Sequence, residues 1–188
     1  PVIAPYDPDA SDIMTMLSPP SALHWFGTDQ VGRDVFSRVL FASRVDLLLC
    51  VAGVLPPLLI GTTIGLLSGY FGGVVDNVFM RIYDLTVAFP FFVLVLAIVG
   101  VLGPGLLNFI LALTLVGWVS YARLVRAQVL TIRESEYIQA AKCLGYRPVA
   151  ILGHHVLPNA IGPVIAYAFR DAVLVMLAFA GFGFFGMG

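Results

Sequence analysis

Two stretches of this chain contain no charged residue for far longer than a soluble fold tolerates. Leu47 to Val75 is uncharged over 29 positions, enough for one crossing plus a turn at Gly69, Gly72 and Gly73, and Leu85 to Ala122 is uncharged over 38 positions. At about 1.5 Å per residue the second stretch would make a helix of roughly 57 Å, nearly twice the ~30 Å hydrocarbon core of a bilayer. It must therefore fold back, and the sequence LGPG (Leu102–Gly105) predicts the turn. With a further apolar run from Ile161 to Gly188, the sequence predicts four membrane spans.

The composition agrees with lipid as the solvent of this chain. Hydrophobic residues make up 60% and charged residues 11%, against roughly 25% charged in soluble domains. The net charge is −1 and no basic tract is present, so nucleic acid is not an expected partner. The sequence has no catalytic motif, and His154 and His155 have no Cys, Asp or Glu at a useful ligand spacing. We therefore expect no catalytic residues, no metal and no enzymatic activity in this chain.

The distribution of Lys and Arg predicts the orientation of the spans. The flanks 70–84 and 123–160 would share one side and hold six of these residues, whereas the segment before Asp46 holds three, together with five aspartates. This favours a cytoplasmic location for 123–160 and an external location for both chain ends. An exported N-terminal segment needs a preceding span or a signal sequence, so a span is expected before Pro1.

The segment GTDQVGRD (Gly27–Asp34) has nearly the glycine spacing of a phosphate-binding loop. However, Arg33 and Asp34 stand where that motif has Lys and Ser/Thr, and no strand-like run precedes it. We therefore reject nucleotide binding there. The apolar residues that follow recur with helical spacing, which predicts a short amphipathic helix on the membrane surface before the first span.

Proline and glycine recur inside the apolar runs. Gly61 and Gly65 form a small-xxx-small pattern that favours close helix packing. Pro90 and the other prolines in these runs are either ordinary membrane-helix residues, whose freed backbone groups are satisfied by neighbours, or hinges.

The polar segment from Glu136 to Ala160 is an unusual insert between apolar runs. Thr131 and Glu134 are spaced like a capping box, Gly145 is placed to end a helix, and Pro148 and Pro158 would start and stop a second one. Its apolar residues fall at i, i+3, i+4 and i+7, with two small alanines in the centre. A stripe of small residues suits docking into the groove of a partner protein better than lying on lipid. The stripe consists of Tyr137, Ala140, Ala141 and Leu144.

Arg170 and Asp171 lie about ten residues into the last apolar run, where an unpaired charge costs several kcal/mol. They either contact the translocation path or a partner subunit, or the span begins near Ala172 and leaves both at the interface.

The insert resembles the EAA loop of ABC-transporter permease subunits. Gln139 takes the place of the Glu, two matching alanines follow, Gly145 comes after three more residues, and His155 stands at the position of an Ile. Its HHVLPN ending is similar to the dipeptide, oligopeptide and nickel branch, and the resemblance to the C-type subunit covers Pro5 to Gly188. It implies an ATPase-coupling interface formed by Glu136, Tyr137, Gln139, Ala140, Ala141, Lys142, Leu144, Gly145, His155, Leu157 and Pro158.

The resemblance implies an all-α integral membrane fold, the MetI-like helix bundle of type I ABC importers. The family has six spans, so about four to five helices are expected here, with the first and last spans missing. The implied organisation is an external segment with an amphipathic helix (1–44), three spans (45–122), a cytoplasmic coupling loop (123–160) and a further span (161–188). The chain departs from the family at Phe179, where a Glu is usual, and Arg170 and Asp171 are also atypical.

The implied function is the permease subunit of an ATP-driven importer in the prokaryotic inner membrane, which moves peptides or related small solutes by alternating access. Its expected partners are a second permease subunit, two cytoplasmic ATPase subunits, an external substrate-binding protein and membrane lipid. ATP and Mg would be bound by the ATPase subunits, so no cofactor is expected in this chain. Residues 136–144 would act as the coupling helix.

Two alternatives from other classes remain at this point. An ion-coupled secondary transporter would need carboxylates facing the interior or inverted repeats, and Asp171 is the single candidate carboxylate deep in a span. A membrane scaffold would have no substrate of its own. The identity of the substrate is not encoded in any motif of the chain.

Overall fold

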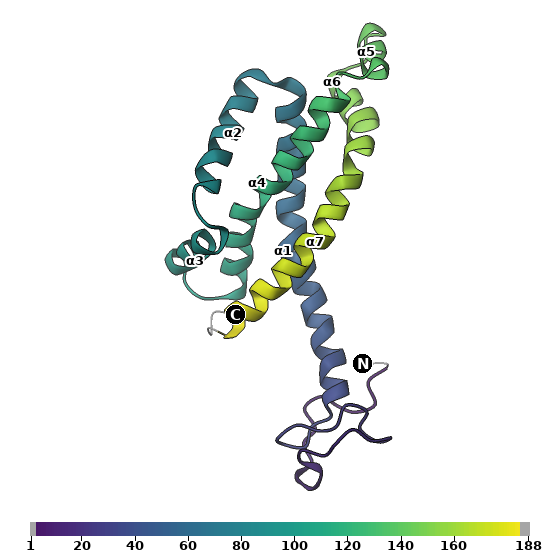
Figure 1. Ribbon diagram of the computed structural model, residues 1–188, viewed down its shortest axis with the longest axis vertical. Coiled ribbons are helices and arrows are strands. Elements are labelled where there is room, and N and C mark those ends of the chain that lie inside the picture. Colours follow the sequence, from purple (N-terminus) through teal and green to yellow (C-terminus); the bar gives the residue numbers. More distant parts are fainter. Residues whose placement is uncertain (1–2, 185–188) are drawn as a thin grey trace. The chain divides into compact units, whose positions relative to one another are not determined.

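The computed structural model describes residues 3–184, and every regular element among them is a helix (Figure 1). This confirms the predicted all-α membrane fold. The chain divides into two compact units, Pro1–Leu49 and Cys50–Gly188. The elements in order are η1 (Ile13–Thr15), α1 (Val35–Phe71), α2 (Gly73–Val87), α3 (Phe91–Leu102), α4 (Leu106–Ile132), α5 (Glu136–Cys143), α6 (Pro148–Ile151), the π-helical turn η2 (Leu152–Val156) and α7 (Leu157–Phe184).

The first unit is a looped segment followed by the start of α1. The predicted short surface helix before the first span is wrong as a separate element, because α1 runs without a break from Val35 to Phe71. Nothing in residues 40–50 interrupts a helix, since the stretch lacks Gly and Pro and its polar residues are compatible with helical backbone. The predicted limit between the external segment 1–44 and the spans 45–122 therefore falls inside α1 and not at a helix end.

The second half of α1 packs closely on α4 through glycines. A Cβ atom on Gly61 would lie 2.4 Å from the carbonyl oxygen of Trp118, and one on Gly65 would lie 2.6 Å from that of Ala122. Gly69, one turn further, would place a Cβ 2.8 Å from the Cβ of Val129. The predicted small-residue packing face is therefore confirmed, and it continues for one more turn than the pattern indicated.

The turns predicted from glycine lie where the helices end, except that Gly69 is still inside α1. Gly72 and Gly73 have φ of +64° and +58° between α1 and α2, and the break between α3 and α4 falls within LGPG. The span expected before LGPG is, however, not a single helix. The axes of α2 and α3 differ by 91° at a break that ends with Pro90. Proline disfavours helical backbone in the preceding residue, which explains why the helix stops there.

The core of the second unit lies between α4 and α7, which run side by side in Figure 1. One apolar cluster joins Phe109 and Leu113 to Val175 and to α3, and a second one surrounds Tyr121 and reaches α5. Helix α5 lies at the end of the unit where α4 finishes and α7 begins.

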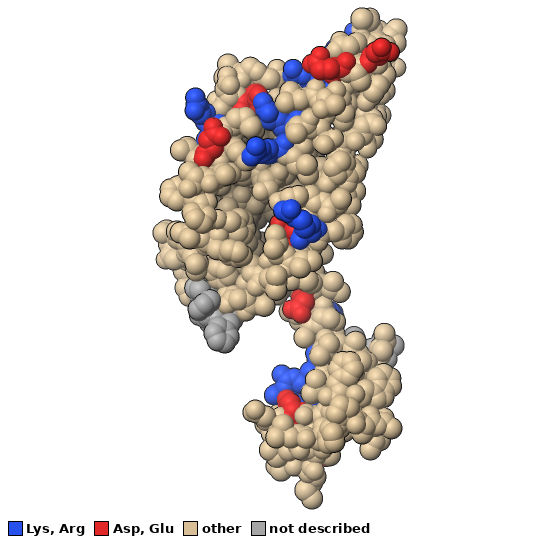
Figure 2. Space-filling view, viewed as in Figure 1, with Lys and Arg blue, Asp and Glu red and all other residues tan. Residues whose placement is uncertain are grey.

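Within residues 3–184, three helices are long and apolar enough to cross a membrane, Val35–Phe71, Leu106–Ile132 and Pro148–Gly183, or four spans if the bent pair α2–α3 counts as one. Their buried share is low, 17% for the last one, as expected for helices whose apolar faces meet lipid or other chains. In the second unit, charged side chains gather toward the end that carries α5 (Figure 2). The last four positions of the predicted span 161–188 lie outside the described residues.

Candidate functional site

Helix α5 presents two different apolar faces. Ile138 and Ala141 are 0% and 7% exposed and belong to the cluster around Tyr121. Tyr137 and Leu144 are 47% and 77% exposed, and Ala140 lies exposed between them. The stripe expected from spacing is therefore divided: Ala141 packs inside the chain, while Tyr137, Ala140 and Leu144 are exposed.

The end of α5 is fixed by the glycine that the sequence singled out. Gly145 has φ of +80°, its N–H donates to the carbonyl of Lys142, and the N–H of Tyr146 donates to that of Ala141. These two bonds form a Schellman motif, in which glycine is favoured because other residues are strained at positive φ. The predicted helix end is confirmed.

The predicted capping box at the start of α5 is wrong. Thr131 lies inside α4, where its hydroxyl donates to the carbonyl of Ala127, and Ser135 is the residue that precedes α5. The error has a simple cause, since α4 continues to Ile132 and occupies the positions that a capping box would need.

Two contacts tie α5 to the rest of the unit. The side-chain amide of Gln139 donates to the backbone carbonyl of Arg133 at 3.1 Å, and the Lys142 ammonium lies 5.8 Å from the centre of the Tyr70 ring. A carboxylate at position 139 has no hydrogen to donate at neutral pH. The substitution of Gln for the Glu of the family pattern therefore creates a bond within the chain.

The segment after α5 is also ordered differently from the prediction. Pro148 starts α6 as expected, but Pro158 does not stop the helix, because α6, η2 and α7 follow one another without a loop. The π-helical turn widens the backbone just before Pro158, where a regular helix would bring its ring against a carbonyl oxygen. His155 lies edge-on to Tyr146, with ring centres 6.0 Å apart. Leu157 is half-buried at the start of α7 and Pro158 is exposed.

A charged cluster missed by the sequence analysis joins α1, α2 and α4. Arg126 donates from Nε and Nη2 to the two carboxylate oxygens of Asp76 at 2.5 and 2.6 Å, and the hydroxyl of Ser68 donates to the same carboxylate. Arg133 donates from Nη1 to the carbonyl of Gly69 at 3.0 Å. These contacts confirm that the flanks 70–84 and 123–160 lie together. The sequence signal that could have indicated this cluster is Asp76, a single acidic residue directly after the uncharged run Leu47 to Val75.

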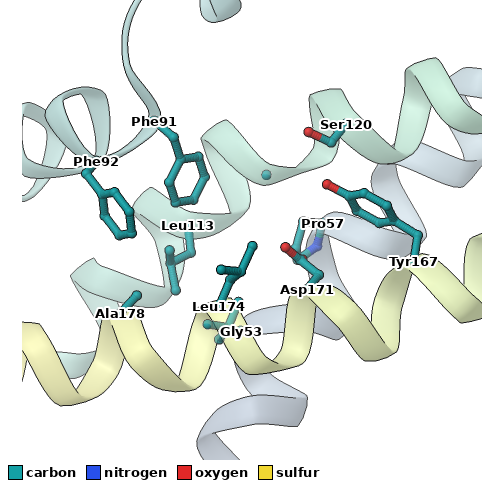
Figure 3. A pocket seen from close by; sticks show the side chains of 12 residues that line it. Gly53, Pro57, Phe91, Phe92, Leu113, Ser120, Tyr167, Asp171, Leu174 and Ala178 are labelled. Atoms are coloured by element: carbon teal, nitrogen blue, oxygen red, sulfur yellow. The ribbon is translucent and has the colours of Figure 1, made fainter.

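Arg170 and Asp171 have different surroundings in the structure. Asp171 accepts a hydrogen bond of 2.8 Å from the hydroxyl of Tyr121 and borders a cavity, whereas the guanidinium of Arg170 lies over the Tyr167 ring at 4.8 Å (Figure 3). Both are inside α7, within the segment Pro148–Gly183 that is long and apolar enough to cross a membrane. Phe179, at the position of the usual Glu, packs edge-on against Phe109 at 4.9 Å.

In the first unit, carboxylates occupy the loop that resembles a phosphate-binding motif. Asp29 accepts hydrogen bonds from the backbone N–H groups of Arg33 and Val31 and from both Arg33 and Arg38 side chains. The bond from the Arg33 backbone, with those from Val31 and the Arg33 side chain, holds the pKa of Asp29 well below its ordinary value. Burial raises the pKa of Asp34, but hydrogen bonds from Ser37 and His24 outweigh it and lower the pKa overall.

The lowered pKa of both carboxylates predicts acid sensitivity of this loop. Because the unfolded loop binds protons at higher pH than the folded loop, its stability is constant above about pH 5 and is lost as the pH falls through the folded pKa values. Hydrogen exchange of residues 27–34, corrected for intrinsic rates, should rise between about pH 4 and about pH 2 on a flat baseline above about pH 5. Asp29→Asn and Asp34→Asn should each reduce this rise, and an equally steep rise in both variants would contradict the assignment to these carboxylates.

The chain matches known proteins along its whole length. The family model described as "Binding-protein-dependent transport system inner membrane component" matches residues 61–188. The chain is 42% identical over 172 residues to the dipeptide transport system permease protein DppC of Alkalihalophilus pseudofirmus, covering 92% of this chain and 57% of that protein. It is 43% identical over 188 residues to the probable D,D-dipeptide transport system permease protein DdpC of Escherichia coli K12, covering 100% and 63%.

A further relative is the nickel transport system permease protein NikC of Escherichia coli K12, which is 41% identical over 184 residues, covering 98% of this chain and 66% of that protein. The chain thus spans 57 to 66% of the length of these relatives. With its long apolar helices, it is a multi-pass membrane protein. The family match, which covers more than half of the chain, and the relatives agree: this chain belongs to the family of binding-protein-dependent transport system inner membrane components.

Proposed function

We propose that this chain is a transmembrane permease subunit of an ATP-driven importer for peptides or related small solutes, located in the prokaryotic inner membrane. The relatives named for dipeptide, D,D-dipeptide and nickel transport support this substrate range. The partners would be a second permease subunit, two cytoplasmic ATPase subunits and an external substrate-binding protein. ATP and Mg would be bound by the ATPase subunits, so this chain would not be an enzyme.

The observation that carries the proposal is the exposed face of α5. A helix of eight residues outside the long spans, with Ile138 held in the core and Tyr137, Ala140 and Leu144 exposed on an adjacent face, fits a groove on a partner protein. The small side chain of Ala140 would let the helix backbone approach closely, with Tyr137 and Leu144 as anchors on either side. Glu136 in the first turn and Lys142 in the last turn complement the helix dipole.

Coupling also needs α5 to transmit motion without bending. The glycine cap at Gly145, the bond from Gln139 to the end of α4, and the contact of Tyr146 with His155 hold α5 against both α4 and η2. A force applied to α5 by ATPase closure would therefore reach α4 and α7 together. In alternating access these helices would rotate as a body while α5 keeps its dock.

The proposal is tested by changing the exposed face of α5 without changing its buried face. In the full importer reconstituted in liposomes, Ala140→Arg should abolish ATP-dependent uptake and co-purification of the ATPase subunits, because the long charged side chain prevents close approach. Ala140→Ser keeps the small size and should retain both. Ala141 is unsuitable for this test, since its burial means that a large residue would damage the chain itself.

The outcome separates the proposal from its alternatives. Normal uptake and ATPase binding by Ala140→Arg would remove α5 as the coupling helix. Uptake that continues without ATP and collapses with the proton gradient would favour an ion-coupled transporter instead.

A further inference from the structure

A cavity of about 290 Å³ lies among α1, α3, α4 and α7, near the middle of α7 (Figure 3). The rings of Phe91 and Phe92 lie on one side of it, and the oxygen-bearing side chains of Ser120, Tyr167 and Asp171 lie on the other. An apolar pocket with a few polar groups on one side is the usual form of a small-molecule site.

The carboxylate of Asp171 is oriented by a hydrogen bond and forms no salt bridge among the described residues. Its Oδ2 accepts the hydroxyl of Tyr121, whose side chain is fully buried and packs edge-on against Tyr167. Among residues 3–184, no Lys, Arg or His nitrogen lies within 4.0 Å of it, and its Oδ1 accepts no hydrogen bond. The adjacent Arg170 lies over the Tyr167 ring instead. A negative charge within a span is costly unless a cation joins it.

The groups around the cavity select for a particular chemistry. A protonated amine supplies three N–H donors and a positive charge, which suit the Asp171 carboxylate together with the hydroxyl oxygens of Ser120 and Tyr167. The aromatic side of the cavity suits an apolar group attached to that amine. A carboxylate ligand would be repelled by Asp171, and a neutral alcohol would leave the charge uncompensated.

We infer that this cavity is a binding site for a small apolar molecule carrying a protonated amine, with Asp171 as the residue that binds the ammonium group. If the chain transports peptides as proposed above, the natural ligand is the free amino end of an apolar peptide. Only this identification of the ligand rests on the proposed function. The amine site itself does not depend on transport.

The test measures equilibrium binding to the full importer in lipid nanodiscs, without nucleotide or external binding protein. The probe is 2-phenylethylamine, and 2-phenylethanol is the uncharged probe of the same shape. The amine should bind at least about tenfold more tightly than the alcohol, and Asp171→Asn should weaken amine binding by at least about tenfold, since a charge-assisted bond is lost. The asparagine oxygen still accepts the Tyr121 hydroxyl, so the fold should be kept. Asp84→Asn, an exposed acid on α2, is the matched control and should have no effect.

A second variant tests the apolar side of the site. Leu174→Trp should fill the cavity that Leu174 borders and weaken both probes alike. Equal binding of amine and alcohol, or amine binding unchanged in Asp171→Asn, would overturn the inference. The inference would also be overturned if the wild-type complex bound no amine and the Asp171→Asn complex lost its second permease subunit. Asp171 would then pair with a basic residue of that subunit. If the wild-type importer binds the amine but shows no ATP-dependent uptake, the proposed function is wrong and the amine site remains.

Discussion

Replacing Gly65 with leucine should prevent the chain from reaching a stable fold. A Cβ at this position already lies 2.6 Å from the carbonyl oxygen of Ala122 and 2.7 Å from the Cβ of Val125, both on α4. The first contact is with backbone, so it cannot be relieved by a change of rotamer. Overpacking typically costs about 1–3 kcal/mol for small additions, and a whole isobutyl group would force α1 and α4 apart. Gly65→Ala should lose about 1–2 kcal/mol, since better helix propensity returns up to about 1 kcal/mol.

The matched control is the same substitution where no neighbour interferes. Gly162 lies inside α7, and a Cβ added there would meet no atom of the described residues within 4 Å, so Gly162→Ala should be neutral or stabilise the protein. Unfolding in mixed detergent micelles, followed by circular dichroism, measures the difference in free energy. If both alanine variants shift the transition in the same direction and by the same amount, close packing at Gly65 is not what holds α1 on α4.

Local chemistry explains which parts of the fold were predictable from sequence. The turns at Gly72 and at LGPG, and the cap at Gly145, follow from residues that allow backbone conformations closed to others. The uncharged runs predicted spans because lipid tolerates few charges. Hydropathy does not report the direction of a helix axis, however. The bend between α2 and α3 before Pro90 was therefore not visible in an otherwise continuous apolar run.

The parts that sequence analysis missed are pairings between distant residues. Asp76 and Arg126 are 50 positions apart, as are Tyr121 and Asp171, and no periodicity links them. The inward face of α5 was missed for a related reason. Spacing identified an apolar stripe but did not reveal that Ile138, which lies beside the stripe, packs into the core together with Ala141. Tertiary packing decides such faces, and local propensity is too weak to override it.

Removing Arg126 should have the second large effect, because it leaves the carboxylate of Asp76 without its cation. The two side chains are 27% and 18% exposed and form a two-pronged contact. Breaking a buried pair by removing one partner costs about 3–5 kcal/mol, and partial exposure should reduce this to about 2–3 kcal/mol for Arg126→Ala. Arg126→Lys should recover part of the loss, because an ammonium keeps the charge but not the planar two-pronged geometry.

The double variant Arg126→Ala, Asp76→Asn distinguishes the pair from its separate parts. Since the main penalty of Arg126→Ala is an unpaired carboxylate, removing that charge as well should make the double variant more stable than Arg126→Ala alone. Arg123→Ala is the control on the same helix: this arginine is exposed and contacts the Tyr83 hydroxyl, so its loss should stay within about 0.5 kcal/mol. Additive losses in the double variant would mean that Asp76 and Arg126 do not stabilise each other. A coupling between them would instead show that α2 and α4 stabilise each other through this pair, which the coupling role proposed for α5 would need.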